Sequence, residues 1–274
     1  MKTIKEIIAQ KSKKERITML TAYDFPTAYF LDEAGIDIIL VGDSLANVVL
    51  GLDSTTEVGM KEMLHHTKAV VRAVKNAMVI GDMPFDSYQI NPRAAVDNAK
   101  QFIEIGCQAV KVEWFKDCPK VVSAITQAGI AVMGHVGLTP QTANKQGGMK
   151  VQGKDAVSAR AIIDSAQKMQ DSGCFSVVLE CIPQEVAELI TNQLKIPTIG
   201  IGAGPHCDGQ VLVIHDLLGL FSRFQPKFSK KYADLGPQIL QAVKQYKKEV
   251  VFGQFPDDAH SFHLSQDELK KLYS

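Results

Sequence analysis

The stretch Ile38-Ile39-Leu40-Val41-Gly42-Asp43-Ser44 decides the fold that we expect from this chain. Its apolar, partly β-branched run predicts a strand buried on both faces, which is typical of parallel sheets. The run stops abruptly at Asp43, whose carboxylate needs a partner, water or a metal ion if it is buried. The same order of residues returns three times, ending in Asp82, Glu113 and Glu180. Four such strand ends predict one site at the C-terminal rim of a parallel barrel.

Strands and helices alternate along most of the chain. We expect eight strands, over residues 17–21, 37–42, 77–82, 108–113, 130–134, 175–180, 197–201 and 211–215. Eight strands alternating with helices is the count of a (β/α)8 TIM barrel. A doubly wound open sheet is the alternative, because periodicity alone does not separate the two.

The whole chain, residues 1–274, is expected to form a single domain, with the barrel over about 15–220. An extra helix over residues 3–10 precedes the first strand, and a helical extension over about 221–274 follows the last helix of the barrel. The extension includes Phe252, Phe255 and Phe262. This apolar tail predicts packing on the barrel or on a neighbouring subunit.

Glycine repeatedly marks the turn from a helix into the next strand. The expected turns lie at Gly35, Gly106, Gly129 and Gly173. Glycine tolerates the left-handed backbone that ends many helices. Asn91-Pro92 predicts the opposite event, a helix start with an N-cap followed by proline.

Composition excludes several classes of protein. The 274 residues are 46% hydrophobic, and 30 basic residues balance 30 acidic ones, which disfavours a nucleic-acid binder. No run of about 18 apolar residues is present, so we expect no membrane span. The five cysteines lack close-paired spacing, which disfavours a disulfide framework or a zinc site. We therefore expect a cytoplasmic protein.

Three acidic residues end successive strands, namely Asp43, Asp82 and Glu113. A single aspartate at a strand end more often caps the following helix. Three neighbouring cases favour a metal site, because carboxylates without a cation would repel one another. Carboxylate and water ligands suit Mg²⁺. The sequence therefore predicts a magnesium site at this rim.

Three further side chains are candidates for the same site. Lys111 lies two residues before Glu113 on one strand, so both face the same side. Lys111 could neutralise an anionic substrate or form a structural ion pair. His135 ends the fifth expected strand, where a substrate hydrogen bond and a structural role are both open. Glu180 has apolar neighbours, which suit a general base, and a paired structural acid is the alternative.

A glycine-rich turn, Gly200-Ile201-Gly202-Ala203-Gly204, follows the seventh expected strand. It resembles the phosphate-binding loops of barrels, but it lacks the spacing of a dinucleotide or P-loop motif. Close approach to a flat ligand and simple turn geometry are equally good interpretations.

The chain resembles ketopantoate hydroxymethyltransferases over nearly its whole length. The stretches that carry the resemblance are Leu20-Thr21-Ala22-Tyr23-Asp24, Val41-Gly42-Asp43-Ser44-Leu45, Gly81-Asp82-Met83-Pro84-Phe85, Val132-Met133-Gly134-His135-Val136-Gly137-Leu138-Thr139-Pro140-Gln141, Lys150-Val151-Gln152-Gly153-Lys154, Pro197-Thr198-Ile199-Gly200-Ile201-Gly202-Ala203-Gly204 and Asp208-Gly209-Gln210-Val211-Leu212-Val213. These motifs are long enough to be specific. The chain departs from the family at Trp114-Phe115, where glycines are usual, and at Asp86, where glycine is common.

The resemblance implies a TIM barrel that moves a one-carbon unit from 5,10-methylenetetrahydrofolate to 3-methyl-2-oxobutanoate. The product would be 2-dehydropantoate, on the route to pantothenate and coenzyme A, formed through a Mg²⁺-stabilised enolate. The resemblance places the metal on Asp43, Asp82 and Glu113. It places the 2-oxo acid on Asp43, Ser44, Asp82 and Lys111, with His135 close by. It makes Glu180 the proton acceptor.

The resemblance also implies a homo-oligomer, often a decamer, in which the C-terminal segment contributes to contacts between subunits. Small-molecule substrates are then the expected partners, with no nucleic acid and no membrane. Two other functions stay open. One is a Mg²⁺-dependent barrel lyase related to phosphoenolpyruvate mutase or isocitrate lyase, and the other is a metabolite sensor without catalysis.

Overall fold

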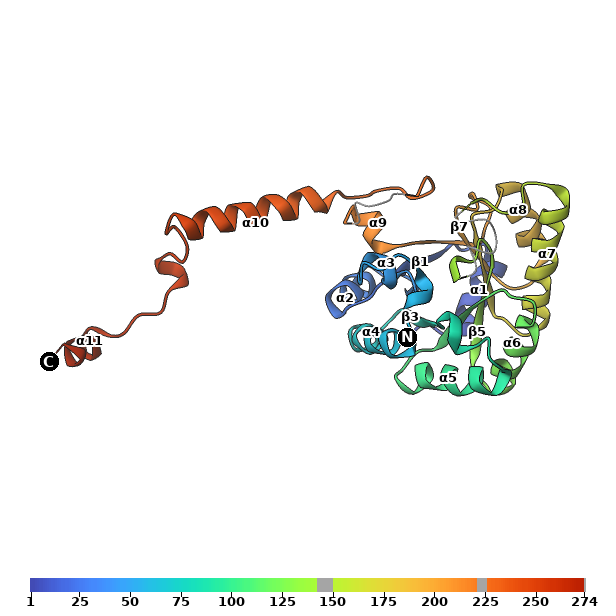
Figure 1. The fold of residues 1–274 in the computed structure, drawn as a ribbon, viewed down its shortest axis with the longest axis horizontal. Coiled ribbons are helices and arrows are strands. Elements are labelled where there is room, and N and C mark those ends of the chain that lie inside the picture. Colours follow the sequence, from blue (N-terminus) through green and yellow to red (C-terminus); the bar gives the residue numbers. More distant parts are fainter. Residues whose placement is uncertain (142–149, 221–225, 274) are drawn as a thin grey trace.

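Eight parallel strands close into one barrel, in the order β1 to β8 (Figure 1). The structure, a computed structural model, describes residues 1–141, 150–220 and 226–273. The strands are β1 (Ile17–Thr21), β2 (Ile38–Val41), β3 (Met78–Asp82), β4 (Ala109–Glu113), β5 (Ala131–Gly137), β6 (Ser176–Glu180), β7 (Thr198–Ile201) and β8 (Gly209–Leu212). β1 pairs with β8, so the (β/α)8 barrel is confirmed and the open sheet is excluded.

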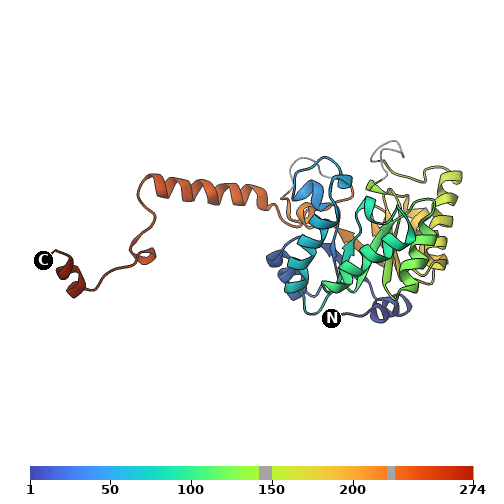
Figure 2. The same cartoon turned by 60° about the horizontal axis from the view of Figure 1, so that its bottom comes forward.

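The helices surround the barrel, except that the first lies at the end where the strands begin and the last two project away from it (Figures 1 and 2). They are α1 (Ile4–Lys13), α2 (Phe25–Glu33), α3 (Leu45–Val48), α4 (Met60–Ala73), α5 (Pro92–Glu104), α6 (Cys118–Gln127), α7 (Ala156–Asp171), α8 (Gln184–Gln193), α9 (Ile214–Leu218), α10 (Leu235–Val251) and α11 (Gln266–Leu272). The Asn91 side chain accepts from the Ala94 backbone N–H, which confirms the expected start of α5. All four glycines expected at helix-to-strand turns have positive φ.

Two strands differ from the expected ranges by more than one residue at an end. β5 continues to Gly137, so His135 lies within the strand. β8 covers 209–212, and the expectation of 211–215 is wrong at both ends. The Ile214 backbone N–H donates to Thr21 Oγ1 at 3.0 Å, which removes it from the strand ladder, and α9 begins there.

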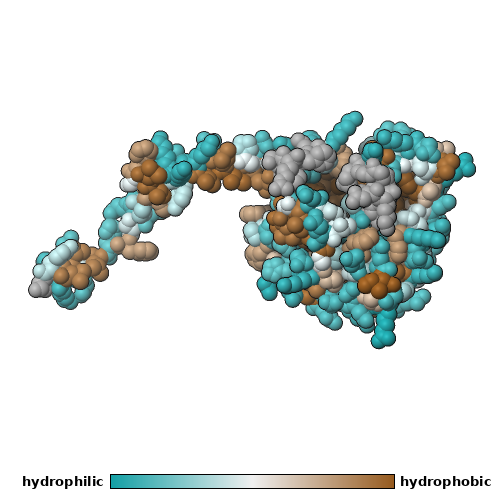
Figure 3. Space-filling view, in the orientation of Figure 1, coloured by the Kyte–Doolittle hydropathy of each residue, from teal (hydrophilic) through white to brown (hydrophobic). Residues whose placement is uncertain are grey.

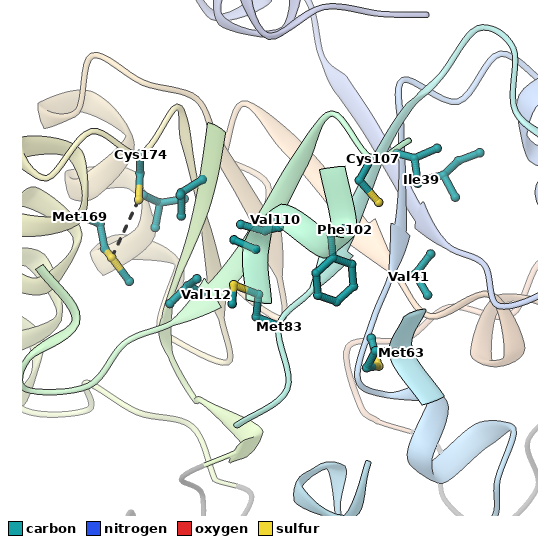
Figure 4. Close-up of a cluster of buried hydrophobic side chains, with 14 of the residues drawn as sticks. Ile39, Val41, Met63, Met83, Phe102, Cys107, Val110, Val112, Met169 and Cys174 are labelled. Carbon is teal, nitrogen blue, oxygen red and sulfur yellow. Dashed lines mark hydrogen bonds between the residues drawn. The ribbon is translucent and has the colours of Figure 1, made fainter. Parts of the chain in front are cut away.

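The larger apolar core lies between the strands and the surrounding helices (Figure 4). Phe102 of α5, Val110 and Val112 of β4 are fully buried in it. Cys107 and Cys174 are buried and free, and both lie within this apolar core as small packing residues. This layer fixes the strands, and it leaves their other face for the inside of the barrel.

A second apolar cluster fills the inside of the barrel. It includes Met78 and Ile80 of β3 and Met133 of β5, all fully buried. Ile7 of α1 belongs to the same cluster, and Figure 2 shows α1 at the bottom edge of the barrel, near the marked N-terminus. The extra N-terminal helix therefore covers the end of the barrel where the strands begin.

From α10 onward, the C-terminal extension projects away from the barrel (Figures 1 and 2). α10 has no buried residue, and the apolar side chains beyond it are also exposed. The expectation that this tail packs on its own barrel is wrong, and packing on another subunit stays a prediction. The expected start of the extension at residue 221 falls on 221–225, outside the described residues. In the described part of the chain, no helix is long and apolar enough to cross a membrane.

Asp32 of α2 joins this helix to the turn that precedes β3. Its carboxylate accepts backbone N–H groups of Lys75, Asn76 and Ala77 at 2.7–2.9 Å. Asp32→Ala would leave buried N–H groups without an acceptor, and we expect it to lower the free energy of unfolding by about 3 kcal/mol at pH 7. Urea unfolding of both proteins measures this difference.

The pH dependence of that difference provides an internal check. Burial alone would raise the pKa of Asp32, but the backbone N–H groups outweigh it and leave the pKa lowered. The stabilisation should be full above the unfolded-state pKa of about 3.9 and should disappear as the pH falls through the folded-state pKa. Asp97→Ala on α5, which removes only a 4.0 Å surface pair, is the control and should change little. Equal losses in the two variants would contradict the role of Asp32.

Candidate active site

The inward-facing rows of the strands change from apolar to polar near the C-terminal rim. Side chains two residues apart on a strand face the same side. Asp82 follows Ile80 in this way on β3, and Lys111 and Glu113 follow Ala109 on β4. His135 on β5 and Glu180 on β6 continue the rows of Met133 and Val178. The candidate site is therefore the top polar layer of the barrel interior.

The pairing of β3 with β4 places Asp82 beside Lys111. Lys111 Nζ lies 2.8 and 2.7 Å from the two carboxylate oxygens of Asp82, and both side chains are buried. Burial raises the pKa of Asp82 to about 7, against the opposing effect of Lys111. Burial lowers the pKa of the Lys111 ammonium, but the neighbouring carboxylates outweigh it and leave that pKa raised. Lys111 therefore stays charged inside the barrel.

His135 lies between two carboxylates. Its Nδ1 is 3.2 Å from Glu113 Oε1, and its Nε2 is 3.1 Å from Glu180 Oε2. Neither nitrogen has an aligned hydrogen-bond partner among the described residues. Burial lowers the pKa of His135, but the two carboxylates outweigh it and raise the pKa to about 9. An imidazolium here links the end of β4 to the end of β6.

Glu180 is the most accessible member of this polar layer, with 14% of its side chain exposed. Its carbonyl accepts the Leu138 backbone N–H at 2.9 Å, just after the end of β5. A Cβ on Gly137, whose φ is +97°, would lie 2.3 Å from that carbonyl oxygen. Only glycine lets β5 approach β6 closely enough here to hold the backbone of Glu180.

Asp43 and Ser44 come from the loop directly after β2. The Asp43 backbone N–H donates to Asp82 Oδ2 at 3.2 Å. Ser44 Oγ lies 2.8 Å from the hydroxyl of Tyr23, a fully buried residue after β1. The structure therefore brings the sequence-predicted residues of β2, β3 and β4 to one place.

Gln141 is a member of the site that sequence reasoning did not single out. Its side-chain amide donates to Asp43 Oδ2 at 2.9 Å, and its backbone N–H donates to Glu113 Oε2 at 3.1 Å. Gln141 ends the long motif that contains His135, which was the available signal. An uncharged residue outside the strands gives no chemical reason to select it from sequence alone.

The space beside the glycine-rich turn after β7 is filled by a side chain of the protein itself. Gly202 has φ +62°, and a Cβ on it would lie 2.8 Å from the ring of Phe228. This contact favours the interpretation of the turn as packing geometry rather than as a phosphate site.

The candidate residues line one cavity of about 750 Å³. Pockets for drug-sized ligands span about 300–1,000 Å³, so a small acid would leave room for part of a second ligand. Among the described residues, six carboxylates line the cavity and only Lys111 and His135 can oppose them. This excess of negative charge favours a bound cation.

The fit of the site to a divalent cation depends on Asp43, Asp82 and Glu113. In the described ranges, no three His, Cys, Asp or Glu side chains form a ready-made metal cage. Both oxygens of Asp82 contact Lys111, whereas the buried Glu113 Oε1 has no aligned hydrogen bond. Mg²⁺ usually binds one or two carboxylates and keeps several waters or substrate oxygens. The residues fit a hydrated ion of this kind better than a fully enclosed one.

Comparison with known proteins assigns the chain to a family. The model of the ketopantoate hydroxymethyltransferase family matches residues 1–258. A 3-methyl-2-oxobutanoate hydroxymethyltransferase of Syntrophomonas wolfei is 53% identical over 272 residues, which cover 99% of each chain. Its counterpart in Syntrophobacter fumaroxidans is 55% identical, over 98% of this chain and 96% of the relative.

Solved structures share the fold at much lower identity. A phosphonopyruvate hydrolase, solved with oxalate and Mg²⁺, has a TM-score of 0.62 at 13% identity and covers 100% of this chain and 95% of its own. A 2,3-dimethylmalate lyase of the PEP mutase/isocitrate lyase superfamily has a TM-score of 0.60 at 14% identity, over 100% of this chain and 98% of its own. At these identities the likeness concerns the barrel alone. The family match and the near full-length identity to its members show that the chain belongs to the ketopantoate hydroxymethyltransferase family.

Proposed function

We propose that the protein transfers a hydroxymethyl group from 5,10-methylenetetrahydrofolate to 3-methyl-2-oxobutanoate, giving 2-dehydropantoate for pantothenate and coenzyme A biosynthesis. One observation carries the proposal. A single cavity gathers three strand-end carboxylates, a charged lysine and an accessible glutamate, in a chain 53–55% identical to enzymes named for this activity.

The acidic half of the site would bind the 2-oxo acid. Lys111 supplies a fixed positive charge for the substrate carboxylate, and Ser44 supplies a hydroxyl held by Tyr23. Asp43, Asp82 and Glu113 would hold Mg²⁺, which as a Lewis acid would polarise the 2-oxo group of the substrate. The excess negative charge of the cavity explains why an anionic substrate would need this cation.

Glu180 would remove the proton from C3 of the substrate. It reaches the cavity from β6, which is three strands away from the strand β3 that carries Asp82. Its side chain is partly exposed. His135 contacts one of its two carboxylate oxygens, which leaves the other oxygen to accept a proton. A carboxylate that is positioned and accessible in this way suits general-base chemistry.

The carbon left by deprotonation would attack the methylene carbon of the folate. A bond forms between C3 and the methylene carbon. The two bonds from the methylene carbon to the folate nitrogens break, and water supplies the hydroxyl oxygen. The C3 proton and one proton of water end on the two folate nitrogens, so that tetrahydrofolate leaves. The remaining volume of the cavity supports binding of the folate beside the 2-oxo acid.

Product formation tests the proposal and separates it from its rivals. The purified protein would be incubated with Mg²⁺ and 3-methyl-2-oxobutanoate, with and without 5,10-methylenetetrahydrofolate, and 2-dehydropantoate measured by mass spectrometry. We expect product only with the folate, and exchange of the C3 hydrogen with deuterated water in both cases. A barrel lyase would act without folate, and a sensor would bind the acid without exchange.

We also propose that the protein is a homo-oligomer, as expected a decamer, in which α10 packs on another copy. The helix projects from the barrel and carries an apolar stripe of Ile239, Val243, Tyr246 and Val250, all 44–58% exposed (Figure 3). Their spacing of three and four residues places them on one face. Large exposed apolar patches commonly mark interfaces between proteins.

Val243→Asp combined with Tyr246→Asp is expected to reduce the oligomer to smaller species, because two charges would be buried in the interface. Sedimentation velocity measures the change in mass. Gln241→Asp with Gln245→Asp adds the same charge to the opposite, polar face of α10 and should leave the mass unchanged. If both double variants sediment like the original protein, α10 is not the interface.

A further inference from the structure

Gln141 contacts two of the three proposed metal ligands at the same time. Its Nε2 donates to Asp43 Oδ2 at 2.9 Å, and its backbone N–H donates to Glu113 Oε2 at 3.1 Å. The side chain is only 5% exposed. One buried residue thus bridges carboxylates that come from two different strands.

The orientation of the Gln141 amide is fixed from both ends. The hydroxyl of Tyr88 donates to Oε1, and the carbonyl of Met83 accepts from Nε2 at 3.2 Å. A phenol that donates to the amide oxygen forces the amide nitrogen to the other side. Rotation of the amide would place its oxygen against the Asp43 carboxylate, which is repulsive. The donor to Asp43 is therefore set by the surroundings.

Tyr88 packs in turn against Phe115, the residue that follows Trp114 after β4. Tyr88 is fully buried, and its ring lies 5.8 Å from the ring of Phe115 at an interplanar angle of 51°. Phe115 follows β4 two residues after Glu113. Aromatic rings at this separation pack favourably. A continuous set of contacts therefore runs from Phe115 through Tyr88 to Gln141.

We infer that Gln141, held by Tyr88, is a positioning residue for the divalent cation. It would fix one oxygen of Asp43 and one oxygen of Glu113, and so direct the other oxygen of each carboxylate toward the ion. Hydrogen bonds that orient metal-ligating carboxylates typically contribute about 10–100-fold to metal affinity or activity. The inference rests on the metal site of the proposed function, and it adds to that site a residue that does not touch the metal.

A purely structural role for Gln141 makes a different prediction. Removing its amide would then lower the stability of the protein and leave metal affinity unchanged. A positioning role changes metal affinity in protein that remains folded. Metal affinity and stability must therefore be measured on the same variants.

The test measures binding of Mn²⁺ by electron paramagnetic resonance, without substrate or folate. Gln141→Met keeps the size of the side chain and the backbone bond to Glu113, and it removes the donor to Asp43. We expect its Kd for Mn²⁺ to rise by about tenfold or more. Tyr88→Phe removes only the hydroxyl and leaves Met83 to orient the amide, so we expect a smaller rise in the same direction. Thermal unfolding is recorded for each variant.

Gln10→Met is the matched control. Gln10 is also a buried glutamine, and its Nε2 donates to the Arg16 carbonyl beside the start of β1, at the other end of the barrel. Its Kd for Mn²⁺ should equal that of the original protein. A Kd of folded Gln141→Met within about twofold of the original would overturn the inference and leave the metal site standing. If Gln141→Met does not fold, an unchanged Kd of Tyr88→Phe overturns it instead. No binding to the original protein would refute the metal site and the inference together.

Discussion

Glu180→Gln is expected to lower turnover by about 10²–10⁴-fold and to leave binding of 3-methyl-2-oxobutanoate unchanged. Glutamine has the size of glutamate but cannot accept the C3 proton. The substrate carboxylate would be held by Lys111 and the groups at the ends of β2 and β3, which the substitution does not touch. A loss of rate without a loss of binding is therefore the pattern that a general base predicts.

Proton NMR measures the step directly, as exchange of the C3 hydrogen in deuterated water with Mg²⁺ and without folate. The exchange rate of Glu180→Gln should fall by the same factor as turnover. Glu188→Gln, an exposed change on the helix after β6, should exchange like the original protein. Undiminished exchange in Glu180→Gln would show that another group removes the proton, even if product formation stops.

Asp82→Ala is expected to abolish metal-dependent binding of the 2-oxo acid. Loss of a group that only orients a metal ligand lowers metal affinity by roughly 10–100-fold, and loss of the ligand itself should lower metal affinity further. The same change leaves the buried Lys111 ammonium without its carboxylate partner, and breaking a buried ion pair costs about 3–5 kcal/mol. The variant should therefore lose both Mg²⁺ affinity and stability.

Calorimetric titration with Mg²⁺ and urea unfolding separate these two losses. Asp82→Asn keeps an oxygen near Lys111, so it serves as a second variant if Asp82→Ala does not fold. Asp208→Ala is the matched control, because it breaks the 2.8 Å pair with Lys11 at the opposite end of the barrel. It should lose stability and keep Mg²⁺ affinity. Normal Mg²⁺ affinity in either Asp82 variant would remove Asp82 from the metal site.

The sequence predicts the parallel sheet and which residues gather at its rim, but closure of the sheet into a barrel is established only by the pairing of β1 with β8. Apolar strands with acidic ends predict a buried parallel sheet, and glycine turns separate the units. Alternation along β4 also predicts that Lys111 and Glu113 share one side, as the structure has it. These predictions succeed because each depends on neighbouring residues in one segment.

What the sequence could not supply are contacts between strands. The register that places Asp82 beside Lys111, and Glu113 beside His135, depends on the packing of the whole barrel. Asp43 lies beyond the end of β2, so strand alternation does not determine its direction. The end of β8 was misplaced because its last backbone groups leave the ladder for Thr21, which lies almost 200 positions earlier.

The filled interior of the barrel restricts how two ligands can share the cavity. Apolar side chains pack below the polar layer, and α1 covers the end beyond them. If the protein has the proposed function, we expect the acid that binds Lys111 to arrive before the bulkier folate, which would lie between the acid and the C-terminal rim of the described strands. Release should then run in reverse, with tetrahydrofolate departing first. Steady-state kinetics of this family member should accordingly be sequential and ordered, with the small acid as the leading substrate.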